Sequence, residues 1–145
     1  MRESLFNLVG PVDGAHVLDL FAGSGALGLE ALSRGAADAT FVESDREACR
    51  VINANLDKLG FQARVLCQDA VRALAGERRR FDLVLCDPPY GYDRSRLDPL
   101  FAGLLEPNGL LVLETAGREE AAVVPRLTER TSRRYGSARL TLFEQ

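Results

Sequence analysis

Apolar strand-like segments alternate with helix-like segments five times, and this alternation restricts the fold more than any other feature of the chain. Strands that are separated by helices pair in parallel, with right-handed crossovers and with helices on both faces of the sheet. The strand-like segments are His16–Leu20, Ala39–Glu43, Arg64–Cys67, Phe81–Cys86 and Leu110–Glu114. The sequence therefore predicts an α/β fold with a doubly wound, mostly parallel sheet.

The last part of the sequence departs from this alternation. Two strand-like segments, Thr131–Tyr135 and Ala138–Phe143, adjoin across a Gly136-Ser137 turn and predict a C-terminal antiparallel hairpin. A Pro107-Asn108-Gly109 turn is expected before the fifth strand. The expected helices are Leu5–Val9, the segment after Gly28 as far as Arg34, Arg46–Leu59 with Asp45 as its cap, Ala70–Leu74, Asp98–Leu105 and Glu119–Leu127.

Length and composition predict one compact domain over residues 1–145, because 46% of the residues are apolar and nothing indicates disorder. No apolar run reaches the ~20 residues of a membrane helix. Met1 is followed by Arg-Glu-Ser and not by the apolar stretch of a signal peptide. We therefore expect a cytoplasmic protein without a membrane partner.

Histidine and cysteine usage narrows the chemistry that the chain can perform. His16 is the only histidine, which excludes a histidine-based nucleophile and a His-rich metal site. Cys49, Cys67 and Cys86 have no paired spacing and are predicted to be small buried hydrophobes. No metal is expected, and catalysis must come from carboxylates, backbone groups or a cofactor.

The chemically suggestive residues all lie at the carboxyl ends of the five predicted parallel strands. Ligands of such sheets bind outside these ends, so we expect the residues to gather at one edge of the sheet. They are Asp19, Gly23, Glu43, Asp69, Asp87 and Glu114.

The loop after the first strand matches the glycine fingerprint of dinucleotide sites at Gly23, Gly25 and Gly28. Taken alone, the fingerprint suggests NAD, whose pyrophosphate would lie at the helix N-terminus. Asp19, however, lies four residues before Gly23. A carboxylate aimed at the loop would repel a pyrophosphate but attract the ammonium of S-adenosylmethionine, which carries no phosphate. The loop therefore favours S-adenosylmethionine.

The next two strands supply the other predicted cofactor contacts. Glu43 suits the two ribose hydroxyls as a bidentate acceptor. Asp69 and the neighbouring backbone suit the adenine amino group, and Asp69 is equally suited to cap the following helix. The predicted cofactor-binding residues are Asp19, Phe21, Ala22, Gly23, Ser24, Gly25, Gly28, Glu43, Ser44, Asp69 and Ala70.

The fourth strand runs directly into Asp87-Pro88-Pro89-Tyr90. The two prolines stiffen the backbone and leave its carbonyls free to accept hydrogen bonds. Asp87 adds a carboxylate acceptor, and Tyr90 adds a ring on which a base can stack. The segment by itself fits either a stiff turn or a site for a flat, amino-bearing ligand. Its expected place beside the cofactor loop favours the ligand site.

Two of these motifs, Val17-Leu-Asp-Leu-Phe-Ala-Gly-Ser-Gly25 and Asp87-Pro-Pro-Tyr90, resemble those of class I S-adenosylmethionine-dependent methyltransferases that act on exocyclic or amide nitrogens. Arg2-Glu-Ser-Leu-Phe-Asn7, residues 25–36 and residues 134–142 further resemble the bacterial 16S rRNA guanine-N2 methyltransferase family. The similarity covers nearly all of the chain. It implies a Rossmann-like methyltransferase domain that is monomeric, with 16S rRNA or the assembling small ribosomal subunit as partner.

The resemblance also implies a catalytic set consisting of Asp87, Pro88, Pro89 and Tyr90. Asp87 and the Pro88 carbonyl would accept the two hydrogens of the guanine N2 amine and point its lone pair at the sulfonium methyl group. Tyr90 would stack on the base. A base inside structured RNA must be extruded to reach such a pocket, at a cost of a few kcal/mol.

Members of this family usually carry a basic segment ahead of the opening motif, which Met1 precedes directly here. The net charge of −3 also argues against a surface that is basic throughout. Either the sequence begins late or the basic segment is truly absent. In the second case, phosphate contacts would fall to a small set of arginines, namely Arg2, Arg94, Arg96, Arg133, Arg134 and Arg139.

Three rival functions remain open at this stage. A methyltransferase acting on adenine N6, or on another amino group of a nucleic acid, would use the same Asp87 motif. An NAD-dependent oxidoreductase would use the glycine loop but is disfavoured by Asp19. A non-catalytic cofactor-binding or RNA-docking module would keep the loop without needing Asp87 and Tyr90.

Overall fold

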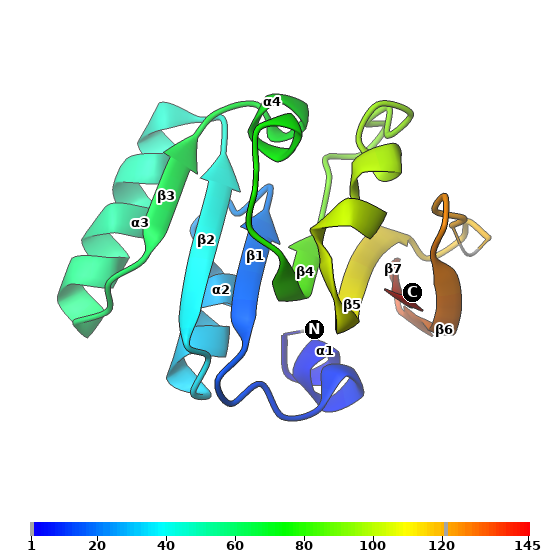
Figure 1. Cartoon of the computed structure of the whole chain (residues 1–145), viewed down its shortest axis with the longest axis horizontal. Helices are drawn as coiled ribbons and strands as arrows, with labels where there is room; N and C mark the ends of the chain where they lie inside the picture. Colours follow the sequence, from blue (N-terminus) through cyan, green and yellow to red (C-terminus); the bar gives the residue numbers. More distant parts are fainter. Residues whose placement is uncertain (1, 121) are drawn as a thin grey trace.

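The computed structural model, which describes residues 2–120 and 122–145, is built on one seven-stranded sheet with the order β3-β2-β1-β4-β5-β7-β6 (Figure 1). The first five strands run parallel to one another, and β7 is antiparallel to both β5 and β6. The predicted fold class is therefore confirmed. The strands are β1 (His16–Leu20), β2 (Asp38–Glu43), β3 (Arg64–Cys67), β4 (Phe81–Cys86), β5 (Leu105–Ala116), β6 (Thr128–Tyr135) and β7 (Ala138–Glu144).

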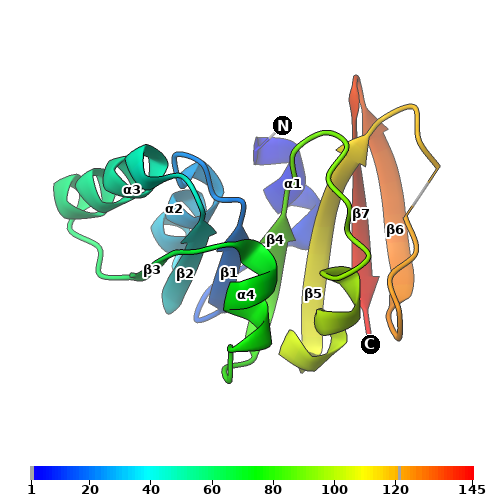
Figure 2. The same ribbon diagram turned by 90° about the horizontal axis from the view of Figure 1, so that it is seen from above.

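Helices cover both faces of the sheet, as Figure 2 shows. One face packs against α1 (Arg2–Val9), α2 (Ala26–Ser33) and α3 (Arg46–Leu59). The other packs against α4 (Ala70–Ala75) and the turns that precede β5. Successive residues of a strand point to opposite faces, so Val17 lies in the first of these cores and Leu18 in the second. Among residues 2–120 and 122–145, no helix has the length and apolar character that crossing a membrane requires.

Local signals determine the helix that follows β2. The Asp45 carboxylate accepts a hydrogen bond from the Ala48 N–H at 3.0 Å and caps the helix at its start. Gly60 ends it with φ +76°, a conformation that glycine adopts without strain. Ile52 and Leu56 form its buried face. The predicted bounds Arg46–Leu59 are confirmed.

The predicted helix Asp98–Leu105 is wrong. The segment forms two single 3-10 turns, η1 (Asp98–Leu100) and η2 (Ala102–Leu104), and Leu105 is already extended and paired with Phe81 of β4. Tertiary packing overrides helix propensity here, because Phe101 and Leu104 are buried in the second core within a few residues of a strand. Both residues must reach the core just before the chain becomes extended at Leu105, and two short 3-10 turns meet this requirement.

The predicted turn at Pro107-Asn108-Gly109 is also wrong, since these residues lie inside β5. The pairing of β5 with β4 jumps from Phe81 opposite Leu105 to Leu83 opposite Leu110, so a bulge accommodates the extra residues. Gly109 is required at this bulge, because a Cβ atom there would lie 2.8 Å from the Phe81 carbonyl oxygen. The turn residues therefore mark an irregular strand and not its beginning.

The predicted helix Glu119–Leu127 is wrong wherever the structure describes it, that is, at all of its residues except Ala121. Pro125 lacks an N–H and restricts the residue before it, and Arg126 takes φ +62°. Val124 is nevertheless buried in the second core. The apolar side chain of Val124 therefore anchors a loop to the sheet and does not mark the buried face of a helix.

The cysteines are confirmed as buried hydrophobes at two of the three positions. Cys49 and Cys86 are buried, whereas Cys67 is exposed. Cys67 is the last residue of β3, which lies at the edge of the sheet, so this end of the strand is less covered than the central strands.

Candidate active site

The loop that follows β1 is held in an unusual backbone conformation. Phe21, Gly23 and Gly25 all have positive φ, at +56°, +60° and +82°. The conformation is natural for glycine, but in a phenylalanine it is strained, a feature that clusters at functional sites. The Ala22 N–H donates to the Val42 carbonyl at 3.1 Å, which ties the loop to β2. The loop is therefore fixed before any ligand arrives.

Glu43 joins this loop to the one that follows β2. Its Oε1 accepts a hydrogen bond from the Gly23 N–H and its Oε2 accepts one from the Asp45 N–H, each at 2.8 Å. A carboxylate oxygen accepts more than one hydrogen bond, so both oxygens keep capacity for a ligand's hydroxyl groups. The structure thus orients Glu43 as a two-oxygen acceptor beside the glycine loop.

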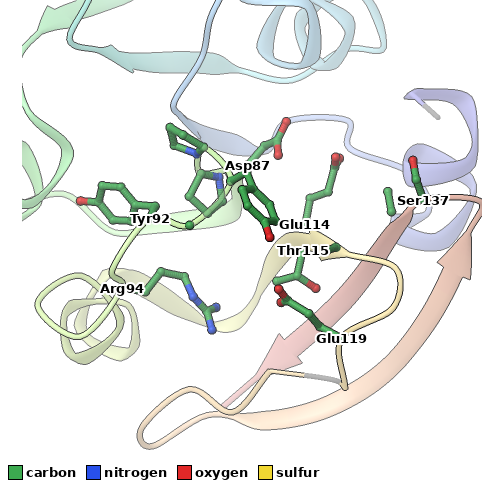
Figure 3. A pocket seen from close by; sticks show the side chains of 13 residues that line it. Asp87, Tyr92, Arg94, Glu114, Thr115, Glu119 and Ser137 are labelled. Atoms are coloured by element: carbon green, nitrogen blue, oxygen red, sulfur yellow. The ribbon is translucent and has the colours of Figure 1, made fainter.

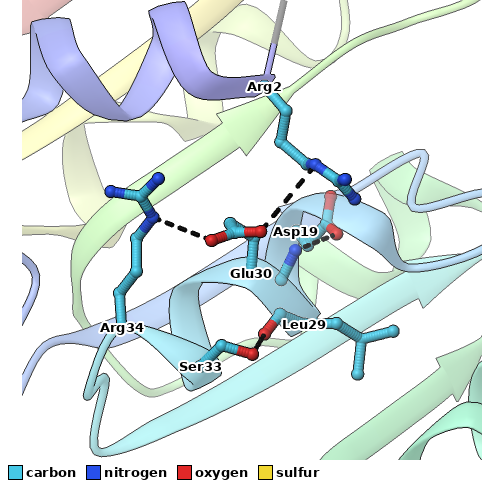
Figure 4. A network of polar contacts seen from close by, with 7 residues as sticks. Arg2, Asp19, Leu29, Glu30, Ser33 and Arg34 are labelled. Carbon is cyan, nitrogen blue, oxygen red and sulfur yellow. Dashed lines mark hydrogen bonds and ion pairs between the residues drawn. The ribbon is translucent and has the colours of Figure 1, made fainter.

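Asp19 lies beneath the first turn of α2, where it is 2% exposed and accepts a hydrogen bond from the Gly28 N–H at 3.0 Å (Figure 4). Burial raises the pKa of Asp19 to about 7, against the lowering effect of that hydrogen bond. The charges of Asp87 and Glu43 raise the pKa further. Asp19 is therefore an acid whose ionisation responds to charge on either side of the site.

Gly28 is the third glycine of the fingerprint, and it is a buried residue of α2 that faces Phe41 of β2. A Cβ atom there would overlap Cε1 of Phe41 and would lie 3.1 Å from Oδ2 of Asp19. Gly28 therefore allows α2 to pack closely against β2. Its N–H is also the donor to the Asp19 carboxylate.

Replacing Gly28 with alanine should lower the free energy of unfolding by about 1–3 kcal/mol, because the methyl group must displace the Phe41 ring. Gly103→Ala is the matched control, since a Cβ atom at Gly103 meets nothing within 4 Å. Urea unfolding of both variants measures the difference. Equal stability of the two variants would contradict the packing role of Gly28.

The remaining cofactor candidates are Ser24 of the glycine loop and three residues near the ends of the next two strands. Asp69 caps α4, with its Oδ2 accepting a hydrogen bond from the Arg72 N–H at 3.1 Å. Ser44 and Asp69 are exposed, and Ala70 is the buried first residue of α4. Ser24 is exposed, and its carbonyl accepts a hydrogen bond from Asn55. The helix-cap interpretation of Asp69 is confirmed, and its second oxygen is not used by the cap.

A cavity of about 420 Å³ lies at the ends of β4 and β5, beside the glycine loop (Figure 3). It brings together all four residues of the predicted catalytic set and none of the predicted cofactor set. The lining residues are Asp87, Pro88, Pro89, Tyr90, Gly91, Tyr92, Arg94, Glu114, Thr115, Ala116, Glu119, Ser137 and Ala138.

Asp87 and Glu114 form a carboxyl pair in this cavity. Their carboxyl groups approach closely enough to share a hydrogen bond whenever one of them carries a proton. Partial burial raises the pKa of both groups. The charge of Asp87 and the hydrogen bond between the two carboxyls raise the pKa of Glu114 further. The same hydrogen bond lowers the pKa of Asp87. Glu114 is therefore the weaker acid of the pair, and Asp87 is the more acidic partner.

Two aromatic side chains complete the cavity and connect it to the glycine loop. Tyr90 is 83% exposed, and its hydroxyl accepts a hydrogen bond from Nη2 of Arg118 at 2.9 Å. The Arg118 guanidinium lies 5.9 Å from the centre of the Tyr90 ring. Tyr92 contacts Phe21 edge to face, with ring centres 5.0 Å apart. The strained loop and the Asp87 segment are therefore in direct contact.

Residues 1–144 match the model of the family described as Conserved hypothetical protein 95. The chain is a member of this family. A structure of a conserved hypothetical protein from Streptococcus pyogenes superposes with a TM-score of 0.90 at 33% identity, over 100% of this chain and 96% of that one.

Two relatives of this family member are named Ribosomal RNA small subunit methyltransferase D. The Escherichia coli K12 protein is 46% identical over 116 residues, which are 79% of this chain and 57% of the relative. The Haemophilus influenzae protein is 36% identical over 124 residues, 79% of this chain and 64% of the relative. The chain thus matches less than two thirds of either relative. The resemblance to small-subunit rRNA methyltransferases is confirmed at the level of the family.

A more distant structure has the same fold. SMU.776, in complex with SAH (S-adenosylhomocysteine), superposes with a TM-score of 0.80 at 16% identity, over 99% of this chain and 48% of that one. The identity is low, so the likeness shows that this family member has the same architecture.

Glu114 was predicted at a strand end but not as the partner of Asp87. Their pairing follows from the strand order of the structure, because β4 and β5 are parallel neighbours with Cys86 opposite Leu113. The next residue of each strand is therefore an acid facing an acid. Tyr92 and Arg118 were missed without any comparable signal in the sequence.

Proposed function

We propose that the chain is the methyltransferase domain, over residues 1–145, of an enzyme that transfers a methyl group from S-adenosylmethionine to the N2 amine of a guanine in 16S rRNA. The observation that carries the proposal is the cavity in which Asp87, Pro88 and Tyr90 lie beside the glycine loop. The names of the family relatives support rRNA as the substrate class. The proposed enzyme is a cytoplasmic monomer whose partner is the rRNA or the assembling small subunit.

The acids around the glycine loop fit S-adenosylmethionine better than a dinucleotide. Glu43 is aimed by two backbone N–H groups to accept from ribose hydroxyls. Asp19 is a buried acid whose ionised form a nearby ammonium would stabilise. Asp19, close to the glycine loop, would repel a pyrophosphate, which disfavours NAD. When bound, S-adenosylmethionine supplies an electrophilic methyl group on a sulfonium, and no metal is needed.

The cavity residues would orient the amine that receives the methyl group. The N2 lone pair of guanine is delocalised into the ring, so the amine needs polarising and aiming. Asp87 and the Pro88 carbonyl accept its two hydrogens, and Tyr90 supports the base by stacking. Positioning of this kind contributes about 7–11 kcal/mol in favourable cases. The proton that the amine loses passes to the carboxyl pair of Asp87 and Glu114.

Exposed arginines near the cavity are candidates for contacts with RNA phosphates. Arg133 and Arg134 lie exposed on β6, and Arg96 lies exposed after the Asp87 segment. Arg139 is partly engaged, since its Nε donates to the Glu119 carbonyl at 3.0 Å. Arg2 lies apart from this group and pairs with Glu30 of α2 at 3.8 Å.

The decisive experiment follows labelled methyl groups into small-subunit rRNA that lacks the modification, either free or assembled with ribosomal proteins. Nucleoside analysis should find N2-methylguanosine in at least one of the two substrates. N6-methyladenosine instead would favour the rival methyltransferase. Failure to bind S-adenosylmethionine, together with binding of NAD, would overturn the cofactor assignment.

Replacing Tyr90 with alanine should lower kcat/KM for rRNA about 5- to 150-fold, because stacking of a base on an aromatic ring contributes about 1–3 kcal/mol. Tyr90→Phe is the matched control. It keeps the ring and loses only the hydrogen bond from Arg118, so its kcat/KM should stay within about threefold of the unmodified enzyme. Steady-state methylation assays separate the two variants, and equal losses in both would refute stacking.

A further inference from the structure

Strand register places a second acid directly beside the proposed amine-binding group. β4 and β5 are parallel, and Cys86 pairs with Leu113, so Asp87 and Glu114 are the next residues of the two strands. Both line the same cavity, and their carboxyl groups approach each other there (Figure 3). The amine has only two hydrogens, which Asp87 and Pro88 accept in the proposed mechanism. Glu114 is therefore an acceptor without a role in orienting the base.

Guanine differs from the other amino-bearing bases in having a ring N–H donor, N1–H, on one side of its amine; N3, on the other side, is an acceptor. In guanine the N2 amine adjoins N1–H, which is a second donor. In adenine the N6 amine adjoins N1, and in cytosine the N4 amine adjoins N3, and both of these ring nitrogens are acceptors. A carboxylate beside Asp87 would attract the guanine edge and repel the other two.

On the basis of the proposed function, we propose that Glu114 accepts the N1–H of the target guanine and thereby selects guanine over adenine and cytosine. Two neighbouring carboxylates repel each other when nothing is bound, and partial burial together with this repulsion raises the pKa of Glu114. The guanine edge offers N–H donors to both groups and relieves the repulsion. An adenine edge would place the N1 lone pair against Glu114 and leave this carboxylate without a donor. A site built to accept a hydrogen bond strongly rejects a substrate that lacks the donor.

The charged groups around Glu114 are consistent with this role. Asp87 faces it across the sheet edge, and Asp19 lies behind Asp87 with its charge coupled to it. Arg118 is hydrogen-bonded to Tyr90. Arg94, which lines the cavity, pairs with Asp98 at 3.7 Å. Neither arginine forms an ion pair with Glu114 in the described part of the chain.

The test uses an rRNA fragment that contains the guanine mapped by nucleoside analysis, made with either guanine or 2-aminopurine at that position. 2-Aminopurine keeps the amine but has a lone pair at N1 in place of N1–H. The unmodified enzyme should methylate guanine about 10- to 100-fold faster, in kcat/KM, than 2-aminopurine. In Glu114→Gln, whose amide both donates and accepts, the preference should shrink to within about threefold.

Glu129→Gln is the control, because Glu129 is exposed on β6 away from the cavity, and it should keep the full preference. Calorimetry with S-adenosylmethionine shows that each variant is folded. A purely structural Glu114 would slow both substrates equally, so an unchanged preference in Glu114→Gln would overturn the proposal. Equal rates of the unmodified enzyme on the two bases would overturn it as well, even if Glu114→Gln failed to fold. Absence of N2-methylguanosine on natural rRNA would instead refute the proposed function.

Discussion

Replacing Asp87 with asparagine should lower the rate of methyl transfer about 100- to 1000-fold while leaving the affinity for S-adenosylmethionine within about threefold. The asparagine side chain has nearly the same shape, but it is neutral, so its amide oxygen is a weaker acceptor and the amine loses a charge-assisted hydrogen bond. It also removes the charge that raises the pKa of Glu114. Single-turnover assays measure the chemical step, and calorimetry measures cofactor binding.

Asp57→Asn is the matched control for this substitution, because Asp57 is exposed on α3, remote from the cavity. It should change neither quantity. Unaltered turnover in Asp87→Asn would remove the assignment of the amine-binding group. A parallel loss of cofactor binding would move Asp87 into the cofactor site instead.

Replacing Asp19 with asparagine should stabilise the protein at pH 8 while weakening cofactor binding. The pKa of Asp19 rises from 3.8 to about 7 on folding, because the side chain is buried. Between these values the unfolded chain releases a proton that the folded chain keeps, so stability falls as the pH rises through this range. The loss is complete above pH 7 and amounts to about 4 kcal/mol for a shift of this size. Asparagine does not ionise, so Asp19→Asn avoids this loss of stability.

Urea unfolding at pH 4, 6 and 8 tests the stability part of this prediction. The advantage of Asp19→Asn should be smallest at pH 4 and largest at pH 8. Calorimetry tests the binding part, since the ammonium of S-adenosylmethionine favours the ionised form of Asp19. Affinity of the unmodified protein should therefore increase with pH through about 7. A pH-independent affinity in the unmodified protein would remove Asp19 from the ammonium site.

Local signals in the sequence predicted the parallel half of the molecule closely. Strands β1, β3 and β4 have the expected bounds, and so does α3, because Asp45 and Gly60 mark its ends chemically. The errors lie where pairing over a long range outweighs local preference. Leu105 is extended because it pairs with Phe81, and Pro107 lies in a strand because the bulge accepts it.

The same distinction separates the predicted and the missed residues of the site. Asp19, Glu43 and Asp87 were visible because each ends an apolar strand, where ligands of such sheets bind. The partnership of Asp87 with Glu114 depends on which strands are neighbours, and alternation alone does not specify that order. The place of Arg118 over Tyr90 depends on the path of a loop and left no pattern to detect.

The position of β7 in the sheet has a consequence for how the protein acquires its site. β7 lies between β5 and β6, although β6 precedes it in the chain. Until β7 has been synthesised and has docked on β5, β6 lacks the strand with which it pairs in the folded protein. The cavity wall that includes Ser137 and Ala138 forms in the same step. We therefore expect the parallel core to fold first on the ribosome and catalytic competence to arise only with this later, non-local pairing.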